Sequence, residues 1–244
     1  KSDINALFNS PVLGYNSKDD IVYQFWANRD SHEVYYFDPK TDYAPTTAIS
    51  SISWDDPNFP NIEGFGVWAA KCNFTMGPDG KMYSRMLGGN LVRIDVENAR
   101  GENLTNGDLV GTKDGSAYGL VFDPQDENVF YFSNNDKHCI YKYDLRTKEC
   151  ACWAGQEGKS GYLDGPIGQA MFNKPGQMCV DSEGNIILTD TENHCIRKIT
   201  MSTGYVSTLA GKPQNSGYVN GSAEDAQFKK PLGICIDNDD VMYI

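Results

Sequence analysis

The chain has 244 residues and a formal net charge of −12, with 40% hydrophobic and 22% charged residues, a composition typical of a globular protein. The negative charge repels polyanions, so we expect no nucleic-acid partner. No run of 18 apolar residues occurs, so the sequence predicts no helix that spans a membrane.

In chain order, the first pattern is the string DSHEVYYFD at 30–38, in which apolar and polar residues alternate as they do in a strand. The string LGGNLVRID at 87–95 repeats it, with Gly89 in the place of the histidine. Two further copies, DKHCIYKYD at 136–144 and ENHCIRKIT at 192–200, lie 56 residues apart. All three histidines of the chain therefore occupy one repeat position, at 32, 138 and 194.

A longer repeat relates residues 154–181 to residues 210–237 without a gap, again with an offset of 56. The matched residues include an Ala-Gly pair, a Gly-Tyr pair and a Phe followed two residues later by Lys-Pro. We interpret the two phenylalanines, Phe172 and Phe228, as core residues between repeats. The aspartates Asp181 and Asp237 are expected to close turns by side-chain to backbone hydrogen bonds.

Each copy contains four short apolar runs separated by Gly, Asp and Asn turns, which predicts four antiparallel strands per repeat. Repeated four-stranded units indicate an all-β protein of the β-propeller class. We expect a single domain whose ring of blades is incomplete in this sequence, with blades near 20–50, 66–110, 115–155 and 172–211 and a partial blade at 228–244. The long connections at 156–171 and 212–227 are expected to fold over one face.

The strings FNKPGQMCVDSEGNIILTDTENHCIRKI at 172–199 and FKKPLGICIDNDDVMYI at 228–244 resemble the NHL repeat. The lead-in AGxxxxSGYxxG is similar to that of exported gut Bacteroidetes proteins, which often carry an immunoglobulin-like IPT/TIG domain ahead of a six-bladed propeller. The resemblance implies a propeller of the six-bladed type that is incomplete in this sequence. It also implies a periplasmic or outer-surface location, with a lipid anchor and an upstream IPT/TIG-like domain in the full-length chain. It further implies a poorly characterised function, because proteins of this kind are called hydrolases only by analogy.

The candidate ligand site is the mouth of the propeller channel. The residue four positions before the repeat histidine ends the second strand of each blade and is polar but varies among the copies, which suits a surface that reads a specific ligand; these residues are Asn28, Arg85, Asn134 and Asp190. Three more residues precede the first strand of their blades and are expected to rim the same opening: Lys71, Tyr118 and Gln177. Tyr118 and Trp54 offer rings for stacking on a sugar. The alternatives are that the polar side chains cap strand ends and that the aromatic rings pack between blades.

A shared metal site at the histidines is disfavoured, because equivalent positions lie on different blades. Each imidazole is instead expected to hydrogen-bond its own turn. Calcium is the weaker cofactor prediction, either at the acidic turns 123–128 and 237–240 or at the oxygen-bearing set Asp190, Asn134 and Asn28. We interpret most of the seven cysteines as small buried hydrophobic residues, whose disulfide status the sequence leaves open.

Three functions compete. The first is an extracytoplasmic binding or scaffolding module for a carbohydrate or protein ligand. The second is a metal-dependent hydrolase, lactonase or lyase with its site in the channel. The third, RNA binding, fits the net charge least. No GxSxG motif occurs, and His138 and Cys139 are adjacent and so point to opposite faces of a strand, which gives no nucleophile–base pair.

Overall fold

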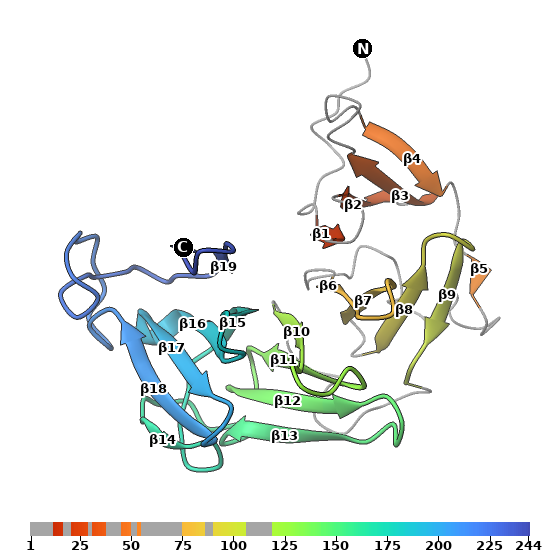
Figure 1. The fold of residues 1–244 in the computed structure, drawn as a ribbon. Coiled ribbons are helices and arrows are strands. Elements are labelled where there is room, and N and C mark those ends of the chain that lie inside the picture. Colours follow the sequence, from red (N-terminus) through yellow and green to blue (C-terminus); the bar gives the residue numbers. More distant parts are fainter. Residues whose placement is uncertain are drawn as a thin grey trace. The chain divides into compact units, whose positions relative to one another are not determined.

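The computed structural model is built from β-strands (Figure 1). It describes backbone and side chains at 75–85, 90–105 and 119–244, and the backbone alone of the strands between residues 12 and 54. Across these residues the one helical element is a turn of 3-10 helix, η5 (Thr191–Asn193). None of the described helical structure is long and apolar enough to cross a bilayer. The chain divides into two compact units, residues 1–113 and 114–244.

The first unit contains two sheets, each with four antiparallel strands in sequence order. One sheet consists of β1 (Val12–Asn16), β2 (Ile21–Asn28), β3 (Ser31–Phe37) and β4 (Pro45–Ile49). The other consists of β6 (Thr75–Met76), β7 (Met82–Arg85), β8 (Leu91–Asp95) and β9 (Arg100–Asn103), and β5 (Ser53–Trp54) pairs in parallel with its outer edge. Both sheets coincide with copies of the sequence repeat.

The second unit repeats this architecture. The third sheet contains β10 (Leu120–Phe122), β11 (Val129–Asn134), β12 (Cys139–Asp144) and β13 (Cys150–Gly155). The fourth contains β15 (Pro175–Val180), β16 (Ile186–Asp190), β17 (Cys195–Thr200) and β18 (Tyr205–Ala210). A fifth sheet contains two strands, β19 (Cys235–Ile236) and β20 (Met242–Tyr243). Four antiparallel strands per copy, predicted from the period-2 patterns, are confirmed for four sheets.

The connection at 156–171 runs differently from the expectation that it folds over one face. Its middle forms β14 (Gly165–Pro166), which pairs antiparallel with β18 and so extends the outer edge of the fourth sheet. The backbone N–H of Gly155 donates to the carbonyl of Ile167 at 2.8 Å, which holds the start of this connection. In the connection at 212–227, the Gly211 N–H donates to the Ala223 carbonyl at 2.8 Å. Covering an edge strand protects its free hydrogen-bonding groups.

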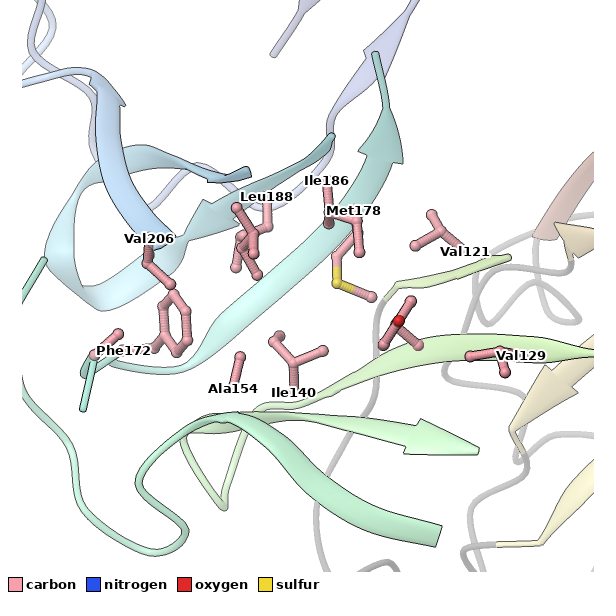
Figure 2. Close-up of a cluster of buried hydrophobic side chains, with 12 residues drawn as sticks. Val121, Val129, Ile140, Ala154, Phe172, Met178, Ile186, Leu188 and Val206 are labelled. Carbon is pink, nitrogen blue, oxygen red and sulfur yellow. The ribbon is translucent and has the colours of Figure 1, made fainter. Parts of the chain in front are cut away.

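The core of the second unit lies between the third and fourth sheets (Figure 2). Alternate residues of β11 and β12 point towards the fourth sheet, and alternate residues of β15 and β16 point back. The labelled side chains converge in the close-up, with Phe172 at one end and Val121 and Val129 towards the other. Ile140, Phe172 and Leu188 expose none of their surface. The third and fourth sheets therefore each bury an apolar face by packing against each other.

Two glycines with left-handed backbone mark equivalent points of the repeat. Gly155 has φ +94° and Gly211 has φ +95°. A Cβ on Gly155 would lie 2.9 Å from the ring of Phe172, and a Cβ on Gly211 would lie 2.9 Å from the ring of Phe228. The Ala-Gly pairs are thus required by the close packing of each phenylalanine, as the repeat alignment suggested.

Replacing Phe172 by Ala is expected to lower the free energy of unfolding by about 3–5 kcal/mol, because the ring is fully buried between two sheets. Urea denaturation followed by tryptophan fluorescence measures this change. Phe228→Ala is the matched control, since that ring has the same repeat position but is only partly buried, and a smaller loss is expected. Equal losses in the two variants would contradict the proposed difference in burial.

Candidate functional site

The guanidinium of Arg197 is completely buried in the middle of β17 and lies at the centre of a polar cluster. Its Nη1 donates to Asp190 Oδ2 at 2.7 Å, and its Nη2 donates to Asp164 Oδ1 at 2.7 Å. Two backbone carbonyls of the 156–171 connection, at Leu163 and Met171, accept from the same group at 2.9 and 3.2 Å. Arg197 therefore fastens this connection to the fourth sheet.

Two aromatic rings complete the surroundings of Arg197. The guanidinium carbon lies 4.9 Å from the centroid of Tyr162 and 5.2 Å from that of Phe172. The hydroxyl of Tyr162 hydrogen-bonds to Thr208 Oγ1 at 2.7 Å, and Asp164 Oδ2 accepts the backbone N–H of Thr208 at 3.1 Å. The cluster thus joins the connection to both β17 and β18.

Asp190 ends β16 and has no exposed surface. Its Oδ1 accepts the backbone N–H of Asn173 at 2.7 Å, and its Oδ2 accepts from Asn193 Nδ2 at 2.9 Å as well as from Arg197. Burial raises the pKa of Asp190 to about 6, against the lowering effect of Arg197 and of the hydrogen bonds from Asn193 and Asn173. Both oxygens are engaged within the fold, so Asp190 holds the corner between β15 and β16.

The two histidines whose side chains the structure describes, His138 and His194, bridge successive repeats, so for them the expectation that each imidazole bonds its own turn is wrong. His138 Nδ1 accepts the backbone N–H of Lys174 at 3.1 Å, and His194 Nδ1 accepts that of Lys230 at 3.2 Å. Each bond spans 36 residues, from the turn after a second strand to the lysine that precedes the proline at the start of the next repeat. Sequence reasoning assigned the histidines to turns correctly but could not see that a turn of one repeat meets the start of the next.

The inner strands of the fourth and fifth sheets also meet through polar contacts. Gln177 Oε1 accepts the backbone N–H of Ile234 at 3.2 Å, and the Gln177 backbone N–H donates to the Leu232 carbonyl at 3.1 Å. The hydroxyls of Thr189 and Thr191 donate to the carbonyls of Leu232 and Pro231 at 3.0 and 2.8 Å. Gln177 is half-buried, and its side-chain carbonyl oxygen is occupied by the hydrogen bond from Ile234.

The structure places the predicted site residues as follows. Asn28, Arg85, Asn134 and Asp190 all end the second strand of their sheets, as the repeat alignment predicted. Arg85 and Asn134 are buried, and Asn134 Oδ1 accepts the N–H of Lys137 at 3.1 Å. Lys71 and Tyr118 lie outside the described residues, as does the side chain of Asn28. That these residues bind a ligand stays a prediction.

The acidic turns weighed as calcium sites have a structural explanation. Asp123 and Asp237 each accept a turn N–H on one carboxylate oxygen. The other oxygen accepts the hydroxyl of a tyrosine in the following strand, at 2.7 Å for Asp123 and 3.1 Å for Asp237. Asp79, in the corresponding turn of the second sheet, makes the same two bonds, with the tyrosine hydroxyl at 2.9 Å. Asp181 accepts the N–H of Asn185 at 2.7 Å, which confirms that Asp181 and Asp237 close turns. Where side chains are described, no group of three or more His, Cys, Asp or Glu residues is close enough to hold a metal ion.

The cysteines are less buried than the sequence suggested. Of the six cysteines that the structure describes, Cys139 and Cys195 are buried, Cys150, Cys152 and Cys179 are half-buried and Cys235 is exposed; these six are free thiols. Two of the half-buried cysteines lie on the outer strand β13 and the third on the inner strand β15.

Sequence reasoning missed Arg197 and its partners Asp164, Tyr162 and Thr208. The one available signal was the pair of adjacent charged residues, Arg197 and Lys198, in the strand string CIRKIT, because neighbouring residues of a strand point to opposite faces and one of the two must face inwards. A buried cation needs a carboxylate partner, and Asp190 and Asp164 supply it.

Comparison with known proteins agrees with this architecture. Residues 172–199 match the NHL repeat. The protein SUPPRESSOR OF QUENCHING 1, chloroplastic, of Arabidopsis thaliana is 25% identical over 260 residues, which cover 98% of this chain and 24% of that protein. A Bacteroides thetaiotaomicron structural-genomics protein of unknown function matches 92% of this chain with a TM-score of 0.75 and 24% identity.

Two further solved structures are similar in fold. An auxiliary nutrient binding protein from Bacteroides thetaiotaomicron matches 94% of this chain with a TM-score of 0.69 and 21% identity. The virginiamycin B lyase of Staphylococcus aureus matches 97% with a TM-score of 0.57 and 15% identity. This chain spans 53%, 54% and 64% of the lengths of these three solved chains. The fold class is the β-propeller, as the sequence predicted. The chain carries the NHL repeat within that fold.

The bond from Lys174 to His138 makes stability depend on pH. Burial, together with the charge of Lys174, lowers the pKa of His138 below 6.5. A lowered pKa in the folded state means that the unfolded chain binds the extra proton more readily, so stability is fully present above about pH 6.5 and falls as the pH drops below it. His138→Asn keeps an acceptor at this position without a titrating group, so its free energy of unfolding should fall less between pH 7.5 and about pH 5.5.

Urea titrations of both proteins across this range measure the difference. If the two proteins lost the same stability on acidification, the His138 bond would not be the source of the pH dependence.

Arg197→Met should lower the free energy of unfolding by about 3–5 kcal/mol, because it leaves Asp190 as an uncompensated buried charge. The double variant, which combines Asp190→Asn with Arg197→Met, should lose less unfolding free energy than the sum of the losses in Asp190→Asn alone and Arg197→Met alone. Lys198→Met is the control on the next residue; its partners Asp181 and Glu183 are near the surface, so a change of about 0–1 kcal/mol is expected. Denaturant titration measures the free energy of unfolding of the three single variants and the double variant. If the losses from Asp190→Asn and Arg197→Met were additive in the double variant, Asp190 and Arg197 would not depend on each other.

Proposed function

We propose that this chain is a binding or scaffolding module that takes a carbohydrate or protein ligand at the channel mouth of the propeller. The observation that carries the proposal is the rigid, repeated frame on which different polar residues stand at equivalent strand ends. Arg85, Asn134 and Asp190 occupy one position in three sheets. Loops on a rigid scaffold are the usual carriers of recognition.

The turns after these strand ends present polar groups to solvent. Asp136 and Lys230 are exposed, and Lys137 and Glu192 are half-buried. Lys230 Nζ lies 2.9 Å from Glu192 Oε1, which orders both side chains at the junction of the fourth and fifth sheets. Similarity to an auxiliary nutrient binding protein supports a binding role. We place Asn28, Lys71, Tyr118 and Gln177 at this mouth as the proposed contacts.

The second candidate is a metal-dependent hydrolase or lyase, which the similarity in fold to virginiamycin B lyase favours. The proposed oxygen ligands of its metal include Asp190. The two carboxylate oxygens of Asp190 instead accept hydrogen bonds from Arg197, Asn193 and Asn173. This use of Asp190 makes the binding function the stronger proposal.

We further propose an extracytoplasmic location, periplasmic or on the outer cell surface, which rests on the resemblance of the lead-in segments to exported proteins. An upstream IPT/TIG-like domain in a longer chain is part of the same proposal. Surface labelling of intact cells that express the full-length protein tests the location.

A ligand that binds only the folded chain should raise its melting temperature by mass action. We expect a positive shift with at least one member of a glycan panel, and loss of that shift in Tyr118→Ala, whose ring is the proposed stacking surface. Tyr205→Ala is the control, because Tyr205 is 46% exposed and starts β18 on the outer part of its sheet. No shift across the panel, together with stoichiometric calcium or zinc in the purified protein, would favour the enzyme instead.

A further inference from the structure

Two thiols lie together at the outer part of the third sheet. Cys139 begins β12, and Cys152 is in the facing strand β13, opposite Tyr141. Because residues two apart on a strand share a face, Cys139 and Cys152 are diagonal neighbours on the same face. A register shift between Ile140 and Tyr141 interrupts the regular pairing at this point, and the two thiols are near enough for each to shift the pKa of the other.

The two thiols are chemically unequal. Cys139 is fully buried, whereas Cys152 is half-buried and its Sγ lies 3.8 Å from the carbonyl oxygen of Gly155. The hydrogen bond from Cys139 lowers the pKa of the Cys152 thiol, against burial and the charge of Glu157. The same contact, together with burial, raises the pKa of Cys139. An accessible thiol with a stabilised thiolate next to a buried partner is the arrangement that favours thiol–disulfide exchange.

The repeat offers a built-in comparison. Cys195 is the equivalent of Cys139 in the fourth sheet and is equally buried, but Thr208 stands where the third sheet has Cys152. The Thr208 hydroxyl contacts Asp164 and Tyr162, and burial raises the pKa of Cys195 to about 12. The thiol pair therefore belongs to the third sheet alone among these two copies.

We propose that Cys139 and Cys152 are a redox-modification site that forms a disulfide between β12 and β13 by exchange with a small-molecule disulfide. The Cys152 thiolate attacks one sulfur of that disulfide, whose S–S bond breaks, and the first small thiolate leaves and takes a proton from water. Cys139 then releases its proton to solvent and attacks Cys152 Sγ, and the second small thiol leaves. Two cysteine thiols are oxidised, and one disulfide is reduced to two thiols.

The bridge lies beside the contact that joins the third and fourth sheets. Cys139 follows His138, whose imidazole accepts the N–H of Lys174. A Cβ on Gly155 would lie 3.2 Å from Cys139 Cα, so the strands are already packed closely here. The disulfide constrains the unfolded chain and holds this corner, so the oxidised protein should melt at a higher temperature than the reduced protein.

The test is incubation of the full chain with oxidised glutathione, followed by tryptic mass spectrometry without reduction. The expected product is peptide 138–142 linked to peptide 149–159 through Cys152, with fragmentation at Ala151 distinguishing Cys152 from Cys150. The link and the rise in melting temperature should be lost in Cys152→Ser and should persist in Cys195→Ser and Cys150→Ser. In Cys139→Ser, Cys152 should retain one glutathionyl group.

Circular dichroism confirms that each variant is folded, and Cys152→Ser changes a half-buried position, so it serves if Cys139→Ser does not fold. A wild-type chain that carries glutathione on Cys152 with no internal link would overturn the proposal. A link through Cys150, or equal modification of Cys195, would overturn it as well. These outcomes do not involve the ligand, so they are independent of the proposed binding function.

Discussion

The second unit depends on the junction between one four-stranded sheet and the next. A sheet of this kind has two apolar faces, and one face of the third sheet and one face of the fourth are buried where these two sheets meet (Figure 2). Phe172 closes one end of this interface against Gly155, and the imidazole of His138 accepts the backbone N–H of Lys174. Apolar burial supplies most of the stability, and the polar contacts fix the register of one sheet on the next.

The charged groups serve the same junction. Arg197 and Asp190 are buried and Asp164 is half-buried, and together they attach the connection that runs from the third sheet to the fourth. Such a group is costly to bury and is tolerated because its carboxylate and carbonyl partners replace water. The consequence for function is that Asp190, at a position expected to face a ligand, has a structural role. In the binding function that we propose, recognition falls to the turns and inner-strand residues around it.

The sequence predicted much of this fold. The 56-residue offset and the alternation of apolar and polar residues in the strands identified the repeats. Each copy needs the same turn residues and the same core phenylalanine, because each forms the same four-stranded sheet. The contacts between copies were not predictable in the same way. The His138 turn meets Lys174 across 36 residues, and the path of 156–171 along β18 depends on the Asp164 carboxylate reaching Arg197. These are tertiary contacts between residues far apart in the sequence, and the pattern of apolar and polar residues within one strand or turn does not predict them.

The central claim is that successive sheets of the second unit stabilise one another rather than fold separately. Native-state hydrogen exchange of Phe172→Ala, read by mass spectrometry, tests it most directly. The account predicts that amides of β11, β12, β16 and β17 all lose protection together. Loss confined to residues near 172, with the third sheet still fully protected, would contradict it.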